Sequence, residues 1–397
     1  MRRGPLLVAL FLAALALRPQ LVGVGPLLPE IQHDLGVSHA VAGLLGTIPV
    51  LCMGLFAPPA PFLSGRIGSR RAIAVALALI GTFGVARLVV PNAAGVILLT
   101  FPLGMGMGLA GAMLPVAVKE RFADRPGFAT GIYTTGITIG AAASAALAVP
   151  LAHAAGGWRT PLFCFSVVTV GLTGLWLWLT RSEPAHVRTE ARPLRLPLRR
   201  PLAWHLVAAF FLMSSVFYGL NAWLPDVYVE RGWSQSSAGA LLGVMNTVTI
   251  PCGFLAAWAA DHIGTRRLWL TGAAALQLLA LLGVLLAPGG GWLWAALLGL
   301  AIGPLFPLTM TLPLDAADRP AEVAALAGMM LGLGYTISAA SPLALGAVRD
   351  LSGGFRAVLW VLVGVAAAQL VVDASLSPAR LAAGRSSGER RLAAASS

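Results

Sequence analysis

The residue with the clearest chemical potential is Arg18, which lies near the middle of the first long apolar stretch. Residues 4–29 read GPLLVALFLAALALRPQLVGVGPLLP, and about 25 residues are enough to cross a bilayer as one helix. Arginine stays charged at any working pH, and placing it mid-membrane costs about 2.5–3.5 kcal/mol on insertion scales. A chain normally tolerates this only where the side chain faces a polar cavity or a partner. Arg18 therefore predicts an internal aqueous path that contains a fixed positive charge.

Uncharged hydrogen-bonding side chains form a stripe on the seventh apolar stretch. The stripe consists of Ser214, Tyr218 and Asn221, which together with Pro225 follow the i, i+4, i+7, i+11 spacing of one helical face. A positive charge that opposes such a stripe suits a small anion or a compact polar molecule. Two other interpretations stay open. Arg18 can pair with a carboxylate, although no Asp or Glu lies mid-span, and Tyr218 and Asn221 can form hydrogen bonds between helices.

Weaker candidates lie on other apolar stretches. Tyr133 in the fifth stretch and Asn246 in the eighth are expected to line a cavity. Arg87 lies near the end of the third stretch, where its long side chain is expected to reach the membrane interface, with a substrate role as the alternative. The His and Cys residues are scattered without metal-ligand or CxxC spacing. We therefore expect no metal, no cofactor and no enzymatic activity.

The composition places the chain in a membrane. Hydrophobic residues make up 58% of the 397 residues and charged residues 11%, whereas a soluble protein carries about 25% charged residues. The start, Met1-Arg2-Arg3 followed by apolar residues, resembles a signal peptide. The apolar run is too long and lacks a convincing cleavage site, so we expect a retained first helix. Polar breaks divide the chain into about twelve spans: 5–29, 38–63, 72–90, 95–118, 128–151, 158–180, 202–225, 236–260, 267–287, 291–314, 323–347 and 354–376.

The net charge of +12 follows the same topology. Of the 27 Lys and Arg residues, two lie within spans, and few fall on the side opposite the chain termini: Arg159, Arg231, Arg349 and Arg356. An excess of Lys and Arg marks the cytoplasmic side of a membrane protein. The pattern predicts a multi-pass protein of the cell (inner) membrane with both termini cytoplasmic, and it argues against nucleic-acid binding.

The two halves of the chain resemble each other at a nearly constant offset of about 196 residues. For example, LPEIQHDLGVS at 28–38 aligns with LPDVYVERGWS at 224–234. Six spans per half in the same orientation form a parallel repeat, a transporter architecture whose site lies between the halves. At this offset Arg18 is matched by Ser214. One half therefore offers a cation where the other offers a hydroxyl.

The predicted fold is an all-α membrane protein with twelve transmembrane helices in two pseudo-symmetric six-helix bundles. Prolines in the segment between the halves argue against a continuous helix, and small polar residues at the end of the chain predict disorder. The expected parts are an N-terminal bundle at 1–180, a cytoplasmic Arg/Pro-rich linker at 181–201, a C-terminal bundle at 202–376 and a disordered basic cytoplasmic tail at 377–397.

Two loops carry a motif that resembles the major facilitator superfamily. GRIGSRR at 65–71 and DHIGTRR at 261–267 partly match its loop signature, G-x-x-x-D-R-x-G-R-R. The first copy has Gly65 where the signature has Asp, whereas Asp261 keeps the acid in the second. The resemblance implies the major facilitator fold and a clamp between the halves on the cytoplasmic side. It implies a conformational role for Arg66, Gly68, Arg70, Asp261, Gly264 and Arg266.

A narrower resemblance runs over nearly the whole chain. LRPQLVGVGPLLPEI at 17–31, YGLNAWLPD at 218–226, and FPLTMTLPLDAADRP with the following GYTISA resemble the cyanate and 2-nitroimidazole permease branch. The resemblance implies that helices 1, 4, 7 and 10 line a central cavity, and Arg18 and Asn221 match motif positions on helices 1 and 7. Many proton-coupled members carry an arginine four residues before the glycine pair of helix 4, where this chain has Thr100. Proton symport, uniport and exchange therefore all stay open.

These observations predict a secondary active or facilitative transporter that works by alternating access, with Arg18 as the central charge. The expected substrate is a small anionic or compact polar molecule, such as a cyanate-like anion, a small carboxylate or a nitroimidazole-like compound. The expected partners are this substrate and membrane lipids, with protons or a counter-substrate as further options, and a monomer is sufficient. Two alternatives stay open: a multidrug exporter of hydrophobic compounds and a non-transporting membrane sensor.

Overall fold

The described parts of the protein are almost entirely helical. The computed structural model describes five stretches of the chain: residues 3–122, 126–181, 196–262, 266–317 and 320–376. No strand occurs in these stretches, and the predicted all-α fold class is confirmed. The predicted tail at 377–397 and most of the predicted linker at 181–201 lie outside the described residues.

The helices follow the predicted order of spans. The first half contains α1 (Arg3–Leu15), α2 (Pro19–Val22), η1 (Gly25–Leu27), α3 (Leu28–Leu35), α4 (His39–Phe56), α5 (Ala60–Ile67), α6 (Ser69–Ala86), α7 (Ala93–Arg121), α8 (Pro126–Ala155) and α9 (Arg159–Leu179). The second half contains α10 (Pro201–Glu230), α11 (Gln235–His262), α12 (Arg266–Leu286), η2 (Pro288–Gly290), α13 (Gly291–Ala316), α14 (Pro320–Ser338), α15 (Ala340–Ser352) and α16 (Phe355–Ser375). By length and composition, 11 helical segments of the described chain can cross a membrane. α11, with 28 residues, occupies the place of the remaining predicted span.

The first span is not the single helix that its apolar length predicts. α1 ends at Leu15, and the chain continues through the short helices α2 and η1 into α3. Pro19 has no backbone N–H, so it cannot donate to the Leu15 carbonyl one turn earlier, and the helix is interrupted. That carbonyl lies against Gly140 of α8, where any side chain would collide with it. Arg18 therefore lies at a helix break rather than in the wall of a continuous helix.

The predicted eleventh span is also divided, into α14 and α15 on either side of Ala339. Pro342 lacks the N–H that would bond the Ser338 carbonyl, which accounts for the interruption. The seventh span behaves differently, because α10 is continuous although Pro225 lies within it. The two halves thus share an order of spans while differing in where their helices break.

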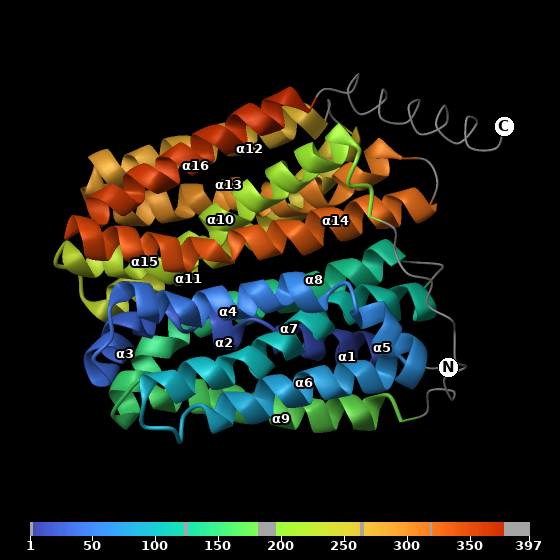
Figure 1. Ribbon diagram of the computed structural model, residues 1–397, viewed down its shortest axis with the longest axis horizontal. Coiled ribbons are helices and arrows are strands. Elements are labelled where there is room, and N and C mark those ends of the chain that lie inside the picture. The colour runs from blue at the N-terminus through green and yellow to red at the C-terminus, as the bar shows by residue number, and fades with distance from the viewer. Residues whose placement is uncertain (1–2, 123–125, 182–195, 263–265, 318–319, 377–397) are drawn as a thin grey trace.

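The two halves form two bundles that lie side by side, with the first half in blue to green and the second in yellow-green to red (Figure 1). α4 packs against α14 and α15, and α8 packs against α11, and these contacts form the seam between the bundles. Glycines allow close approach along the seam: Gly43 and Gly46 of α4 face Pro342, and Gly243 of α11 faces Ala146. Small residues at such positions let helix backbones come close enough for extensive van der Waals contact.

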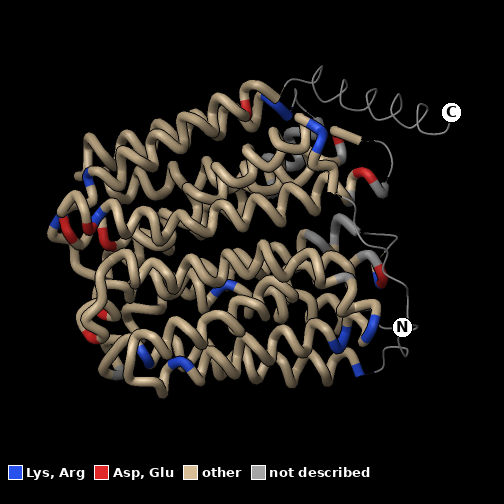
Figure 2. The backbone as a smooth tube through the Cα atoms, in the orientation of Figure 1, with Lys and Arg blue, Asp and Glu red and all other residues tan. Residues whose placement is uncertain are grey.

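Charged residues gather at the two ends of the molecule, and few lie between them (Figure 2). We call the end that carries the start of α1, the α5–α6 junction and the end of α16 the terminal end. The opposite end, which carries α3, the start of α4 and the end of α15, is the distal end. Apolar surface between two polar ends is the pattern of a protein that spans a bilayer.

Candidate functional site

Arg18 joins the two bundles. Its Nη1 donates a hydrogen bond to Tyr218 Oη of α10 at 2.9 Å and lies 3.9 Å from the Met53 sulfur of α4. The Arg18 side chain is buried, with 9% relative exposure. Both partners are uncharged, and within the described stretches no carboxylate forms a salt bridge with Arg18. Neutral groups therefore hold this cation, and no carboxylate among the described residues compensates its charge.

The break in the first span determines where the Arg18 side chain points. This residue directly precedes α2, and its carbonyl accepts the first backbone hydrogen bonds of that short helix. Farther along the span, Gly25 of η1 rests on the Asn221 carbonyl of α10, where any side chain at Gly25 would collide with it. The distal part of the first span is therefore pressed against α10. This contact brings Arg18 to Tyr218.

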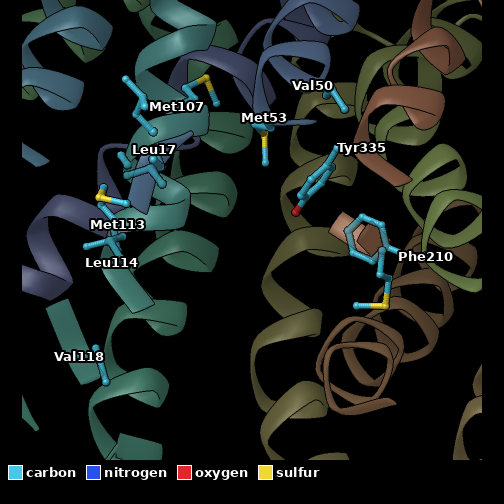
Figure 3. Close-up of a cluster of buried hydrophobic side chains, with 14 of the residues drawn as sticks. Leu17, Val50, Met53, Met107, Met113, Leu114, Val118, Phe210 and Tyr335 are labelled. Carbon is cyan, nitrogen blue, oxygen red and sulfur yellow. The ribbon is translucent and has the colours of Figure 1, made fainter. Parts of the chain in front are cut away.

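Aromatic rings from the C-terminal bundle surround Tyr218. The ring of Tyr335 in α14 lies 6.3 Å from the Tyr218 ring and packs edge-to-face on Phe210 at 4.8 Å. Figure 3 shows Met53 and Tyr335 between the two bundles, with the Tyr335 hydroxyl pointing away from Phe210. Sequence reasoning singled out neither Met53 nor Tyr335. Tyr335 belongs to the GYTISA motif, which was a usable signal, whereas Met53 lies in an apolar run that carries none.

Tyr218 and Asn221 both line a small cavity at the seam, with a volume of about 10 Å³. This is close to the space that one water molecule needs. Asn221 Oδ1 accepts a hydrogen bond from Asn246 Nδ2 of α11 at 3.1 Å, and Asn221 Nδ2 donates to the Phe217 carbonyl at 2.8 Å. Asn221 therefore links two helices, as the alternative interpretation expected, and also presents a polar group at the cavity wall.

Ser214 and Tyr133 lie apart from this group. Ser214 is buried on α10, one turn from Tyr218 toward the terminal end. Tyr133 is half-buried on α8, seven residues before Gly140, which is about 10 Å along a helix. The structure brings Arg18, Tyr218, Asn221 and Asn246 into one connected region, while Ser214 and Tyr133 flank it on the side of the terminal end.

Hydrogen bonds join the bundles at the distal end. The Asp350 carboxylate of α15 accepts from the backbone N–H groups of His39 at 3.2 Å and of Ala40 at 2.8 Å, in the first turn of α4. The His39 ring Nδ1 also lies 2.8 Å from this carboxylate. Leu343 N donates to Thr47 Oγ1 at 3.2 Å. A carboxylate at a helix N-terminus satisfies unpaired N–H groups and interacts favourably with the helix dipole.

Arg70 and Arg266, which occupy matching positions in the two repeats, bond within their own bundles. Arg70 donates from Nε to Thr180 Oγ1 and from Nη2 to the Leu177 carbonyl, both at 3.0 Å. Arg266 Nη1 contacts the Asp315 carboxylate at 2.7 Å. These contacts tie the loops to adjacent helices. A clamp between the halves through these residues stays a prediction.

The other loop residues of the motif are only partly described. Arg66 lies over the ring of Phe62, with 4.4 Å between its Cζ and the ring centroid. Gly68 joins α5 to α6 with a φ of +87°, a backbone conformation that favours glycine. The Asp261 side chain and Gly264 lie outside the described residues.

The structure corrects the expected position of Arg87. Its side chain does not extend to the membrane interface; it is buried, with 1% relative exposure. Arg87 Nη2 donates to Gln20 Oε1 at 2.6 Å, and Nη1 donates to Thr100 Oγ1 at 3.3 Å. These acceptors lie inside the bundle, so the guanidinium finds hydrogen bonds there without reaching water. Sequence reasoning missed Gln20, because 67 residues separate it from Arg87.

The Major Facilitator Superfamily model matches residues 6–339. The cyanate transport protein CynX of Escherichia coli (strain K12) is 32% identical over 352 residues, which cover 88% of this chain and 91% of that protein. The 2-nitroimidazole transporter of the same strain is 30% identical over 371 residues, covering 92% and 93%. The crystal structure of a D-xylose-proton symporter has the same fold, with a TM-score of 0.72, 17% identity, and coverage of 93% of this chain and 97% of that one.

Proposed function

Because the chain belongs to the major facilitator superfamily, we propose that it moves a small anion or a compact polar molecule across the cell membrane by alternating access. Arg18 is the central charge of this proposal. The two bundles rock about the seam, and the substrate site lies between them, as in other parallel-repeat transporters. The names of two relatives, a cyanate transport protein and a 2-nitroimidazole transporter, support this size and class of substrate.

The observation that carries the proposal is the contact of Arg18 with Tyr218 across the seam. A buried guanidinium that only neutral groups hold is costly, and a bound anion offsets that cost. The planar fork of arginine donors suits the two oxygens of a carboxylate and other small planar or linear anions. A substrate that contacts both residues at once ties the bundles together, and such contacts favour the closed state through which the transporter switches faces.

We assign roles to the remaining site residues according to where they lie relative to the contact of Arg18 with Tyr218. Asn221 presents its amide at the cavity wall, and Asn246 behind it fixes the orientation of that amide. Ser214 and Tyr133 lie toward the terminal end, where they line the path that opens on that side. The excess of basic residues makes the terminal end cytoplasmic. In this assignment the bonds from Asp350 to the start of α4 close the outer face of the transporter.

Ligand-induced thermal stabilisation of the purified protein tests the proposal. The panel contains cyanate, nitrate and acetate, with neutral 2-nitroimidazole as a comparison, on wild type and on Arg18→Gln. Binding to the folded state alone adds about 2.7 kcal/mol of stability at a hundredfold excess over Kd. We expect an anion to stabilise wild type and not Arg18→Gln. If only the neutral compound stabilises, and Arg18→Gln still binds it, Arg18 has a structural role and the anion class is wrong.

Flux into proteoliposomes then separates a transporter from a sensor. A stabilising anion is loaded outside the vesicles, and its uptake is compared between wild type and Arg18→Gln. We expect uptake with wild type only. Binding without uptake indicates a sensor, and efflux of hydrophobic dyes without anion uptake indicates a multidrug exporter.

A further inference from the structure

We propose that Arg87 is a positioning residue for the anion site: a second buried cation that holds the break in the first span and adds positive potential to the side of the site that Arg18 occupies. This inference rests on the proposed function. Arg87 does not contact the substrate. It positions the short segment from Arg18 to Gln20, from the side of that segment that faces away from the substrate.

Arg87 follows α6 directly and is enclosed on all sides. The described contacts of its guanidinium are with Gln20 and Thr100, both of which have 0% exposure. Nη2 donates to Gln20 Oε1 at 2.6 Å and also lies 3.4 Å from the Gln20 backbone carbonyl. Arg87 therefore grips both the side chain and the main chain of a residue two positions from Arg18.

The Gln20 amide is fixed in one orientation. Its Nε2 donates to Ser166 Oγ at 2.7 Å and to the Leu162 carbonyl at 2.9 Å, both in α9. A carbonyl only accepts and a guanidinium only donates, so the amide oxygen must face Arg87 and the nitrogen must face α9. Gly84 makes room for this arrangement, because a side chain there would collide with Ser166 Oγ.

The charge of Arg87 has no counterion among the described residues. Its three acceptors are an amide oxygen, a hydroxyl and a backbone carbonyl, and its Nε is buried without a hydrogen-bond partner. Hydrogen bonds from neutral groups lower the cost of burial but leave the positive potential in place. Arg18 and Arg87 thus bring two uncompensated cations to one short segment. An anion that reaches Arg18 interacts with both.

The internal repeat links Arg87 to the helix break. The positions that match Gln20 and Arg87 in the second half are Val216 and Gly283. Val216 lies in the continuous helix α10, and Gly283 packs against the ring of Trp294. The arginine and glutamine therefore occur in the half whose first helix is broken. A broken helix leaves backbone carbonyls without helical donors, and Arg87 supplies one such donor to Gln20.

Thermal stabilisation by cyanate and nitrate, with neutral 2-nitroimidazole alongside, tests the inference on purified full-length protein. For Arg87→Gln we expect anion affinity to fall about tenfold, the scale of one lost charge at close range, while affinity for the neutral compound is unchanged. Arg87→Lys keeps the charge and should recover most of the anion affinity. Arg159→Gln removes an exposed arginine that bonds Asp34, and it should leave anion affinity at the wild-type value.

A second variant separates charge from folding. Gln20→Glu keeps the shape of the side chain but places a carboxylate against Arg87, so it cancels the positive potential. We expect this variant to bind anions about tenfold more weakly and to melt a few degrees higher than wild type without ligand. A purely structural role for Arg87 does not produce these opposite changes. Gln20→Glu also tests the inference about Arg87 if Arg87→Gln fails to fold.

The outcomes distinguish this inference from the proposed function. If Arg18→Gln abolishes anion binding while Arg87→Gln and Gln20→Glu match wild type, the inference about Arg87 is wrong and the proposed function stands. Equal weakening of anionic and neutral ligands in Arg87→Gln also overturns it, because that indicates a general loss of structure. If wild type binds no anion, the proposed function fails. A lower melting temperature of Gln20→Glu then also overturns the inference that the charge of Arg87 is uncompensated.

Discussion

The Asp350 carboxylate of α15 caps the first turn of α4 in the opposite bundle through the backbone N–H of Ala40, at 2.8 Å. Helix caps normally come from the residue that precedes the helix, and here Ser38 also fills that role for the N–H of Val41. The additional cap from α15 exists only while the bundles touch at the distal end. In the proposed alternating-access cycle this contact must break and re-form.

Removing the Asp350 carboxylate is expected to open the distal end more often. Loss of a helix cap costs about 1 kcal/mol, which corresponds to about a fivefold shift in population. The measurement is the reaction of a cysteine at Ala222, which is buried beside the cavity, with a membrane-impermeant maleimide added outside cells. The background carries serine at the three native cysteines: Cys52, Cys164 and Cys252. Asp350→Ala should label about five times faster.

The control for this experiment is Asp34→Ala. Asp34 lies at the same end but bonds Trp158 and Arg159, which belong to its own bundle. Its removal should leave the labelling rate unchanged. Equal acceleration in the two variants would show that any loss of a distal carboxylate loosens the structure, and a gate role for Asp350 would then be wrong.

Substituting Gly25 by alanine is expected to prevent closure of the distal end. A Cβ at this position overlaps the Asn221 carbonyl oxygen of α10, and overpacking of this kind typically costs about 1–3 kcal/mol. The overlap is relieved when the bundles separate. Gly25→Ala should therefore fold and insert normally, label rapidly at Ala222→Cys from outside, and lose substrate flux in proteoliposomes.

Gly171→Ala is the matched control, because a Cβ there meets nothing within 4 Å. Gly171→Ala should retain flux, and its labelling at Ala222→Cys should remain slow. If Gly25→Ala keeps wild-type flux, the contact between η1 and α10 is not needed in the transport cycle, and the close approach of the bundles at this point is only a feature of packing.

Removing the Tyr218 hydroxyl is expected to weaken anion binding. This hydroxyl accepts from Arg18 Nη1 at 2.9 Å, and a hydrogen bond to a charged group contributes about 1.5–3 kcal/mol. Tyr218→Phe should raise the Kd for the stabilising anion at least tenfold in the thermal assay. Tyr228→Phe makes the same change on the same helix, where Tyr228 packs against Trp233, and it should bind as wild type. A wild-type Kd for Tyr218→Phe would contradict the proposed site.

The type and order of the helices could be predicted from local patterns. Long apolar runs separated by polar breaks need only the nearest residues to become membrane helices, since every backbone group is then bonded within its own segment. The motifs at 17–31 and 218–226 likewise pointed to the family to which the chain belongs. Arg18 stood out for the same local reason, because a charge in an apolar run is costly wherever the chain goes.

The breaks within spans were harder to predict. Pro19 and Pro342 interrupt their helices, while Pro225 lies inside the continuous helix α10. A proline removes one hydrogen bond in each case. Whether the helix then breaks depends on what the neighbouring helices offer the freed carbonyl. The Leu15 carbonyl lies against Gly140 of α8, and nothing in the sequence of the first span indicates that neighbour.

The sequence by itself determined that this protein is an all-α transporter of the major facilitator superfamily and that Arg18 lies in its apolar interior. The tertiary structure decided which groups contact the two buried guanidinium groups: Tyr218 across the seam for Arg18, and Gln20 for Arg87. The physical reason is one of range. Hydropathy and helix formation depend on residues within a few turns, whereas the partner of a buried guanidinium depends on which side chains the packing of distant helices brings within about 3 Å.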